Sequence, residues 1–160
     1  FLIDPDHFAM VIADVSGKGI PAALFMVVSR TMIKNTALSG CSPAEILASV
    51  NNQLYENNEA NMFVTVWIGI LTISTGNVVC SNAGHEFPAI RHNGSYELLK
   101  DKHGLVLGVM EDMQYRVRKR IVGNIAGVIC FTALYFRFLY TQMACQRQPT
   151  QRMNCLAQTA

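Results

Sequence analysis

The chain has 160 residues, of which 51% are hydrophobic and 15% charged, with a formal net charge of +2 at pH 7. This length suits one ordinary domain with a buried core, and the apolar stretch of residues 127–136 is shorter than the roughly 20 residues that span a bilayer. Five cysteines without a CxxC spacing argue against a zinc site or a disulfide framework. Together with the lack of a signal-peptide pattern, they indicate a cytoplasmic protein with reduced thiols.

A strand and a glycine-rich loop are the first predicted elements. Residues 8–13 form a short apolar run typical of a buried strand, for which we expect a partner strand upstream of the chain's first residue. Asp14 ends this strand, and Ser16–Gly19 form a tight loop that leads into a helix. This arrangement offers a carboxylate to a cation and backbone N–H groups to a phosphate. The loop lacks the GxxxxGK[ST] spacing of a P-loop, and the alternative is that Asp14 is a turn or capping residue.

Two helices are predicted next. The first begins after Gly19, has Pro21 in its first turn, and ends near Gly40. Its apolar face, by helical spacing, would consist of Ile20, Ala23, Leu24, Val27, Val28 and Thr31. Residues 42–45 form a capping box that opens the second helix, which runs to about Asn57. The apolar face of this second helix would consist of Ile46, Leu47, Val50 and Leu54.

From residue 63 the apolar period changes from that of a helix to that of a strand. Residues 63–73 read as a strand, 74–77 as a hairpin turn and 78–82 as a returning strand. After a break at residues 83–85, a second hairpin is predicted from residues 88–91 and 96–99, with its turn at Asn93-Gly94. Two helices followed by an antiparallel meander indicate an α+β domain.

Four segments carry a resemblance to a known family. They are Val11–Met26, Met62–Thr65, Asn82–Pro88 and Leu105–Gly108. In this order they resemble the motifs of the SpoIIE/RsbU-like branch of the metal-dependent (PPM, PP2C-like) serine/threonine phosphatases. The resemblance covers about residues 1–115 and implies part of a four-layer αββα sandwich. It also implies a two-metal site for Mn²⁺ or Mg²⁺ at one end of the β-sandwich, where the metals activate a water that attacks phosphorus.

The same resemblance assigns roles to individual residues. Asp14 would be the catalytic residue, as a bridging metal ligand, and Val15 would contribute its backbone carbonyl to the metal. The substrate-binding set would be Gly17, Lys18 and Gly19 of the loop together with Asn82, Gly84 and His85 of the later turn. The alternatives are that Lys18 is a solvated loop charge and that His85 is a structural turn residue.

Partners also follow from the resemblance alone. It implies a phosphorylated protein substrate of the STAS-type anti-sigma-factor antagonist class, in bacterial sigma-factor partner switching. An N-terminal sensor or receiver domain, in some cases anchored upstream in a membrane, would regulate the phosphatase, and a homodimer is compatible with it. The alternative function is a catalytically dead protein-binding module.

The C-terminal part departs from the family pattern. Residues 1–112 contain all eleven acidic residues and carry a net charge of −5, whereas residues 113–160 carry +7. A basic nucleic-acid-binding tail would explain the charge, but no Lys/Arg run is present and we expect no nucleic-acid partner. The family's metal-binding aspartate follows an FLYT motif, yet here Gln142 and Met143 follow residues 138–141.

We therefore expect two parts, a partial phosphatase domain in residues 1–115 and a divergent tail in residues 116–160. Our hypothesis is that the chain is translated in a shifted reading frame from about Gln142, and the alternative is a naturally divergent tail. The resemblance also implies an acidic strand upstream of Phe1 that supplies a metal ligand. Because this strand and the aspartate after the FLYT motif are both missing, we expect little or no phosphatase activity from this chain.

Overall fold

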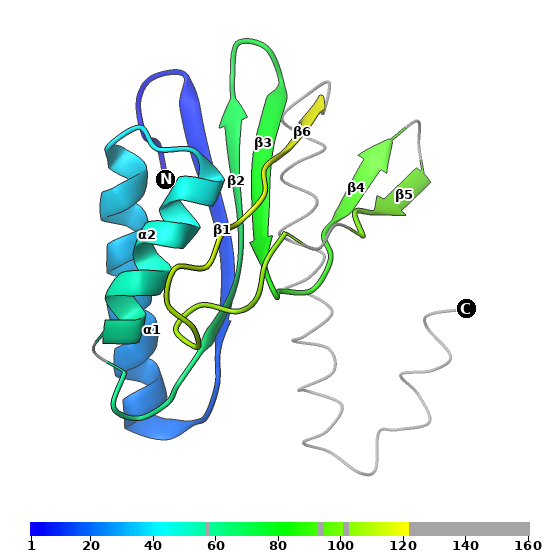
Figure 1. Ribbon diagram of the computed structural model, residues 1–160. Helices are drawn as coiled ribbons and strands as arrows, with labels where there is room; N and C mark the ends of the chain where they lie inside the picture. The colour runs from blue at the N-terminus through cyan, green and yellow to red at the C-terminus, as the bar shows by residue number, and fades with distance from the viewer. Residues whose placement is uncertain (57, 93–94, 101–102, 122–160) are drawn as a thin grey trace, which may run out of the picture.

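The computed structural model describes residues 1–56, 58–92, 95–100 and 103–121, and in it two helices cover one face of a sheet (Figure 1). The helices are α1 (Gly19–Leu38) and α2 (Pro43–Glu56). The sheet has the order β1-β2-β3-β6, made of β1 (His7–Val15), β2 (Val64–Thr72), β3 (Asn77–Ala83) and β6 (Arg118–Ile121). A separate hairpin is formed by β4 (Ala89–His92) and β5 (Ser95–Leu98). The prediction of an α+β fold is confirmed.

All neighbouring strands of the main sheet are antiparallel, and their register decides which residues meet. Asp14 at the end of β1 lies opposite Thr65 near the start of β2. Asn82 at the end of β3 lies opposite Trp67. The end of β1, the start of β2 and the end of β3 therefore share one end of the sheet.

The two faces of the sheet have different surroundings, because successive side chains of a strand point to opposite sides. Val11, Ala13 and Val15 pack with the core cluster that includes the buried residues of α1 and α2. A second cluster on the opposite face contains Met10 and Trp67. By this alternation Asp14 belongs to the face that the helices do not cover.

The second helix follows its sequence pattern closely. The Ser42 backbone N–H donates to Glu45 Oε2 at 2.8 Å, and the Glu45 N–H donates to Ser42 Oγ at 3.4 Å, so the predicted capping box is present. The four residues of the predicted apolar face, Ile46, Leu47, Val50 and Leu54, are all buried. Spacing and capping together were sufficient to place α2.

The first helix has the predicted span, but its predicted apolar face was wrong. Ser29, Ile33 and Ala37 are the buried residues of α1. The predicted face is exposed, with relative exposures of 77% for Ile20, 61% for Leu24, 60% for Val27 and 45% for Val28, and Ala23 and Thr31 are exposed as well. Residues 20–28 are apolar on every side of the helix, so spacing alone cannot select the buried side. Ser29 tolerates burial because its hydroxyl donates to the Phe25 carbonyl at 2.7 Å.

Two matched substitutions test this correction. Leu24→Glu is expected to change the free energy of unfolding by less than about 0.5 kcal/mol, because the side chain is exposed. Ile33→Glu is expected to cost at least about 3 kcal/mol, since Ile33 is 2% exposed and a carboxylate there loses both apolar contacts and hydration. Urea denaturation of both variants measures the difference. Similar losses for the two would contradict the observed orientation of α1.

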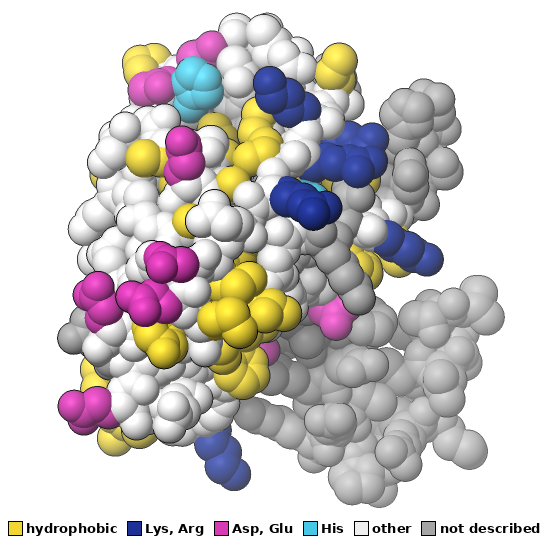
Figure 2. All heavy atoms as spheres, viewed as in Figure 1, with side chains coloured by type: hydrophobic (Ala, Val, Ile, Leu, Met, Phe, Trp, Pro, Cys, Tyr) yellow, Lys and Arg dark blue, Asp and Glu magenta, His cyan; other side chains and the backbone are white. Residues whose placement is uncertain are grey.

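Charged side chains are unevenly distributed over the surface (Figure 2). On the face shown, acidic side chains gather over the helical side, and Lys and Arg side chains gather near β6. Arg118 and Lys119 of β6 are exposed. On this face, acidic and basic side chains therefore lie over different elements.

Several predictions concern residues outside the described part of the chain. These include the turn at Asn93-Gly94, the FLYT segment at residues 138–141, and the proposed change of frame at Gln142. β6 lies beyond residue 115 and pairs with β3, while the division of the chain at 115 stays a prediction. Within the described residues, no helix is both long and apolar enough to cross a membrane.

Candidate functional site

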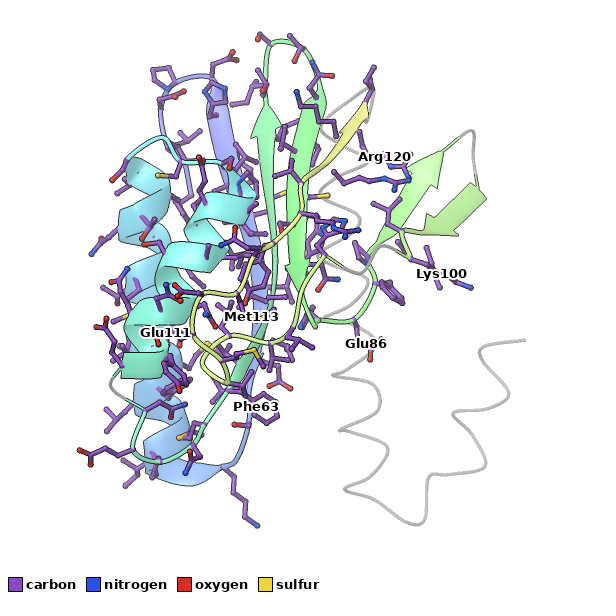
Figure 3. The ribbon with its side chains drawn as sticks, in the orientation of Figure 1. Phe63, Glu86, Lys100, Glu111, Met113 and Arg120 are labelled. Carbon is purple, nitrogen blue, oxygen red and sulfur yellow. The ribbon has the colours of Figure 1, made fainter. Side chains whose placement is uncertain are left out.

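The candidate site lies at the end of the sheet where β1 and β3 end and β2 begins. Figure 3 labels Phe63, just before β2, and Glu86, just after β3, at this same end. Asp14 is exposed here. Three segments far apart in sequence, residues 14–19, 63–65 and 82–85, therefore meet around one carboxylate.

The loop of residues 16–19 is fixed to the start of β2. The Ser16 N–H donates to the Phe63 carbonyl at 2.8 Å, and the Phe63 N–H donates to Ser16 Oγ at 2.8 Å. Gly17 and Gly19 have φ values of +88° and +77°, a region that side chains with a Cβ rarely adopt. The glycines let the chain turn directly from β1 into α1.

The start of α1 is electrostatically open to an anion. Lys18 is the N-cap residue in an extended conformation, and its side chain makes no capping hydrogen bond. The first turn contains no acidic residue. The positive end of the helix dipole and its backbone N–H groups are therefore not neutralised by a carboxylate of that turn, which suits a phosphate near Gly17–Gly19.

The turn after β3 is held by the side chain of Asn82. Its Oδ1 accepts the His85 N–H at 2.7 Å, and its Nδ2 donates to the His85 carbonyl at 3.0 Å. Gly84 has φ +66°, and a Cβ there would lie 2.6 Å from Val106 Cγ1. The turn therefore needs both the amide of Asn82 and the missing side chain of Gly84.

Thr65 connects this turn to the end of β1; it is part of the Met62–Thr65 segment that carries the resemblance, but the sequence assigned it no role in the site. Its hydroxyl Oγ1 lies 2.9 Å from His85 Nδ1 and donates to the Asp14 carbonyl at 3.3 Å. Strand alternation puts Thr65 on the same face as Trp67, and hence on the face of Asp14. The role of Thr65 could not be predicted from the sequence, because it depends on the pairing of Thr65 with Asp14. The register between strands far apart in the chain cannot be read from one sequence.

His85 is half-buried, and its environment acts on its charge in two directions. Burial lowers the pKa of the imidazole, and this exceeds the opposing effect of the negative charges of Asp14 and Glu86. The ring is therefore neutral near pH 7. Its Nε2 atom is buried, which agrees with the structural reading of His85, while its role in substrate binding stays a prediction.

Asp14 and Val15 are the candidate metal ligands at this end of the sheet. Asp14 offers an exposed carboxylate and Val15 a backbone carbonyl, as oxygen ligands for Mn²⁺ or Mg²⁺ require. In the described part of the chain, however, no group of three or more His, Cys, Asp or Glu residues could hold a metal ion. The sequence has no Asp or Glu after Asp112. These residues do not by themselves make up a two-metal site.

Comparison with known proteins gives one consistent result. The family model described as "Stage II sporulation protein E (SpoIIE)" matches residues 4–132. Over 119 residues the chain is 32% identical to the phosphoserine phosphatase RsbU of Bacillus subtilis (strain 168), covering 72% of this chain and 35% of RsbU. The chain thus spans about a third of the length of that relative.

Solved structures agree on the fold. The RsbU and RsbW domains of Rv1364c from Mycobacterium tuberculosis match with a TM-score of 0.66 at 23% identity, covering 76% of this chain and 34% of that one. The PP2C phosphatase domain of SpoIIE from Bacillus subtilis matches with a TM-score of 0.64 at 14% identity, covering 75% and 35%. RsbX in complex with magnesium matches with a TM-score of 0.58 at 16% identity, covering 74% and 56%.

Proposed function

This chain belongs to the Stage II sporulation protein E (SpoIIE) family, and from that membership we propose that it carries part of the catalytic domain of a protein serine/threonine phosphatase. The observation that supports this most is the position of Asp14. Its carboxylate is exposed at the end of β1, directly before the glycine loop and the uncapped start of α1. One end of the sheet thus presents an acceptor for a cation next to donors for a phosphate.

Each part of the site has a separate task in the proposal. The backbone N–H groups of the 17–19 loop and the α1 dipole would hold the phosphoryl oxygens, with Lys18 adding positive charge. Asn82 would hold the shape of the turn at residues 82–85 through its two hydrogen bonds to His85. Gly84 would allow that turn to approach Val106 closely.

PP2C-like phosphatases are metal-dependent, and we propose Mn²⁺ or Mg²⁺ for this family member, with Asp14 and Val15 among the ligands. When bound, such a metal pair supplies a nucleophilic water and neutralises developing charge on the phosphoryl group. Because the described residues contain no group of three or more His, Cys, Asp or Glu that could hold a metal ion, we assign no step to the metals. For the same reason residues 1–160 alone are proposed to be weakly active or inactive.

The biological setting is proposed from the relatives. The 32% identity to RsbU supports a phosphoserine protein as substrate and a role in partner-switching signalling. Within it we propose a STAS-type antagonist as substrate, control by an N-terminal sensor or receiver domain, and a cytoplasmic location. A protein-binding module without catalysis is the second candidate, favoured because the described residues contain no group of three or more His, Cys, Asp or Glu that could hold a metal ion.

Metal titration and hydrolysis of p-nitrophenyl phosphate test the proposal. We expect at most weak Mn²⁺ binding and weak Mn²⁺-dependent hydrolysis by residues 1–160, both falling at least about tenfold in Asp14→Asn, because the exposed carboxylate is lost. Asp6→Asn is the matched control, since Asp6 lies at the other end of β1 and binds Ser74. Hydrolysis that is unchanged in Asp14→Asn would contradict the enzyme. Absence of any Asp14-dependent Mn²⁺ binding would favour the binding module.

A further inference from the structure

Two histidines form hydrogen bonds with Asn82. The hydrogen bonds of their rings place the proton on Nε2 in one ring and on Nδ1 in the other. The Asn82 backbone N–H donates to His103 Nδ1 at 3.1 Å. A nitrogen that accepts a hydrogen bond carries no proton, so the neutral His103 ring has its proton on Nε2. His103 is 8% exposed, which keeps this contact away from water.

The other histidine, His85, lies beside the Thr65 hydroxyl, whose single proton is used in a different hydrogen bond. In the 3.3 Å contact between Thr65 Oγ1 and the Asp14 carbonyl only the hydroxyl can donate, and this contact then uses its single proton. Thr65 Oγ1 can then only accept from His85 Nδ1, which lies 2.9 Å away. With this assignment both contacts of Thr65 Oγ1 are hydrogen bonds, whereas donation from Thr65 to Nδ1 would leave its contact with the Asp14 carbonyl without a proton.

We infer that Thr65 is a positioning residue, which holds His85 as its Nδ1–H tautomer in a chain from His85 Nδ1–H to Thr65 Oγ1 to the Asp14 carbonyl. The turn after β3 is thereby connected to the end of β1 through one hydroxyl. The same Asn82 that bonds His85 through its side chain holds His103 through its backbone, so the two rings carry opposite tautomers.

The hydrogen bonds from His85 through Thr65 to the Asp14 carbonyl limit what His85 can do in the candidate site. Burial keeps His85 neutral near pH 7, so one ring nitrogen carries the proton and the tautomer is well defined. With Nδ1–H used by Thr65, the ring contributes no N–H donor from Nε2 to a phosphate. His85 would then fix the position of the turn relative to Asp14 rather than bind the phosphoryl oxygens. This last step rests on the proposed phosphatase function, whereas the tautomers do not.

Long-range ¹H–¹⁵N NMR of the imidazole rings at pH 7.5 tests the inference on residues 1–160 without metal or substrate. We expect the Nδ1–H pattern for His85 and the Nε2–H pattern for His103, with His85→Gln identifying the first set of signals. Thr65→Val removes the hydroxyl at nearly constant shape and should shift His85 to a tautomer mixture, while His103 stays unchanged. Thr65→Ser keeps the hydroxyl and should restore the native pattern.

Every result decides the question. An Nε2–H pattern for His85 in the native chain would overturn the inference, even if Thr65→Val failed to fold. A native Nδ1–H pattern that survives in Thr65→Val would also overturn it, because some other group would then hold the ring. Loss of the His85 Nδ1–H pattern in Thr65→Val, together with its return in Thr65→Ser, would support the inference. None of these readouts depends on catalysis, so a failure of the phosphatase proposal would be seen separately in the hydrolysis assay.

Discussion

Gly84→Ala is expected to destabilise the protein by about 2–4 kcal/mol, because two penalties coincide at this position. The backbone has φ +66°, where a Cβ costs roughly 1–2 kcal/mol. The added Cβ would also lie 2.6 Å from Val106 Cγ1 and 3.3 Å from the Val106 backbone nitrogen, and such overpacking typically costs about 1–3 kcal/mol. Urea denaturation measures the loss.

Two controls separate these penalties. Gly40 has φ +77° and nothing within 4 Å of an added Cβ, so Gly40→Ala should show only the conformational cost of about 1–2 kcal/mol. In a Val106→Ala background the clash with Cγ1 is gone, and Gly84→Ala should cost at least about 1 kcal/mol less than in the native background. If Gly84→Ala and Gly40→Ala cost the same, and Val106→Ala does not change the cost of Gly84→Ala, then the close approach of Gly84 to Val106 does not affect stability.

Asn51→Leu is expected to cost about 2–5 kcal/mol. Asn51 is fully buried on α2, where its Oδ1 accepts the Gly108 N–H at 3.0 Å and its Nδ2 donates to the Met110 carbonyl at 2.8 Å. Leucine has the same branched shape, is somewhat larger, and leaves both backbone groups without these partners, at about 1–3 kcal/mol each. Thermal and urea denaturation should both show the loss, together with faster amide exchange at Gly108.

The next residue of α2 provides the matched control. Asn52 also contacts the segment before β6, since its Nδ2 donates to Asp112 Oδ1 at 3.1 Å and its Oδ1 accepts the Asp112 N–H at 3.0 Å. These bonds are exposed, so water can replace them, and Asn52→Ala should cost about 1 kcal/mol or less. A larger loss for Asn52→Ala than for Asn51→Leu would mean that burial does not govern these contacts.

The sequence was sufficient where the deciding interactions are local. Ser42 and Glu45 are three residues apart, and the apolar stripe of α2 repeats within one helix, so both could be read directly. The same holds for β2 and β3, which are joined by a short turn and pair with each other. The glycines at 17, 19 and 84 were predicted as site residues, and each has a positive φ that explains its residue type.

The buried side of α1 needed the tertiary structure. Both sides of its first half are apolar, and only packing of Ile33 and Ala37 against the core leaves Ile20 and Leu24 exposed. The free energy of burial depends on which surface lies opposite, and that surface comes from elements distant in sequence.

The candidate site divides in the same way. From the sequence alone came Asp14, the glycine loop and the Asn82–His85 turn as candidate site residues, and the expectation that the departures in the tail weaken the metal site. Only the fold revealed that Thr65 joins His85 to the Asp14 carbonyl, and that Asn51 holds Gly108 across 57 positions of the chain. Spacing along the chain fixes what a residue does within its own helix, strand or turn. Hydrogen bonds between such elements depend on strand register and helix packing, which are set by the three-dimensional fit of the whole domain.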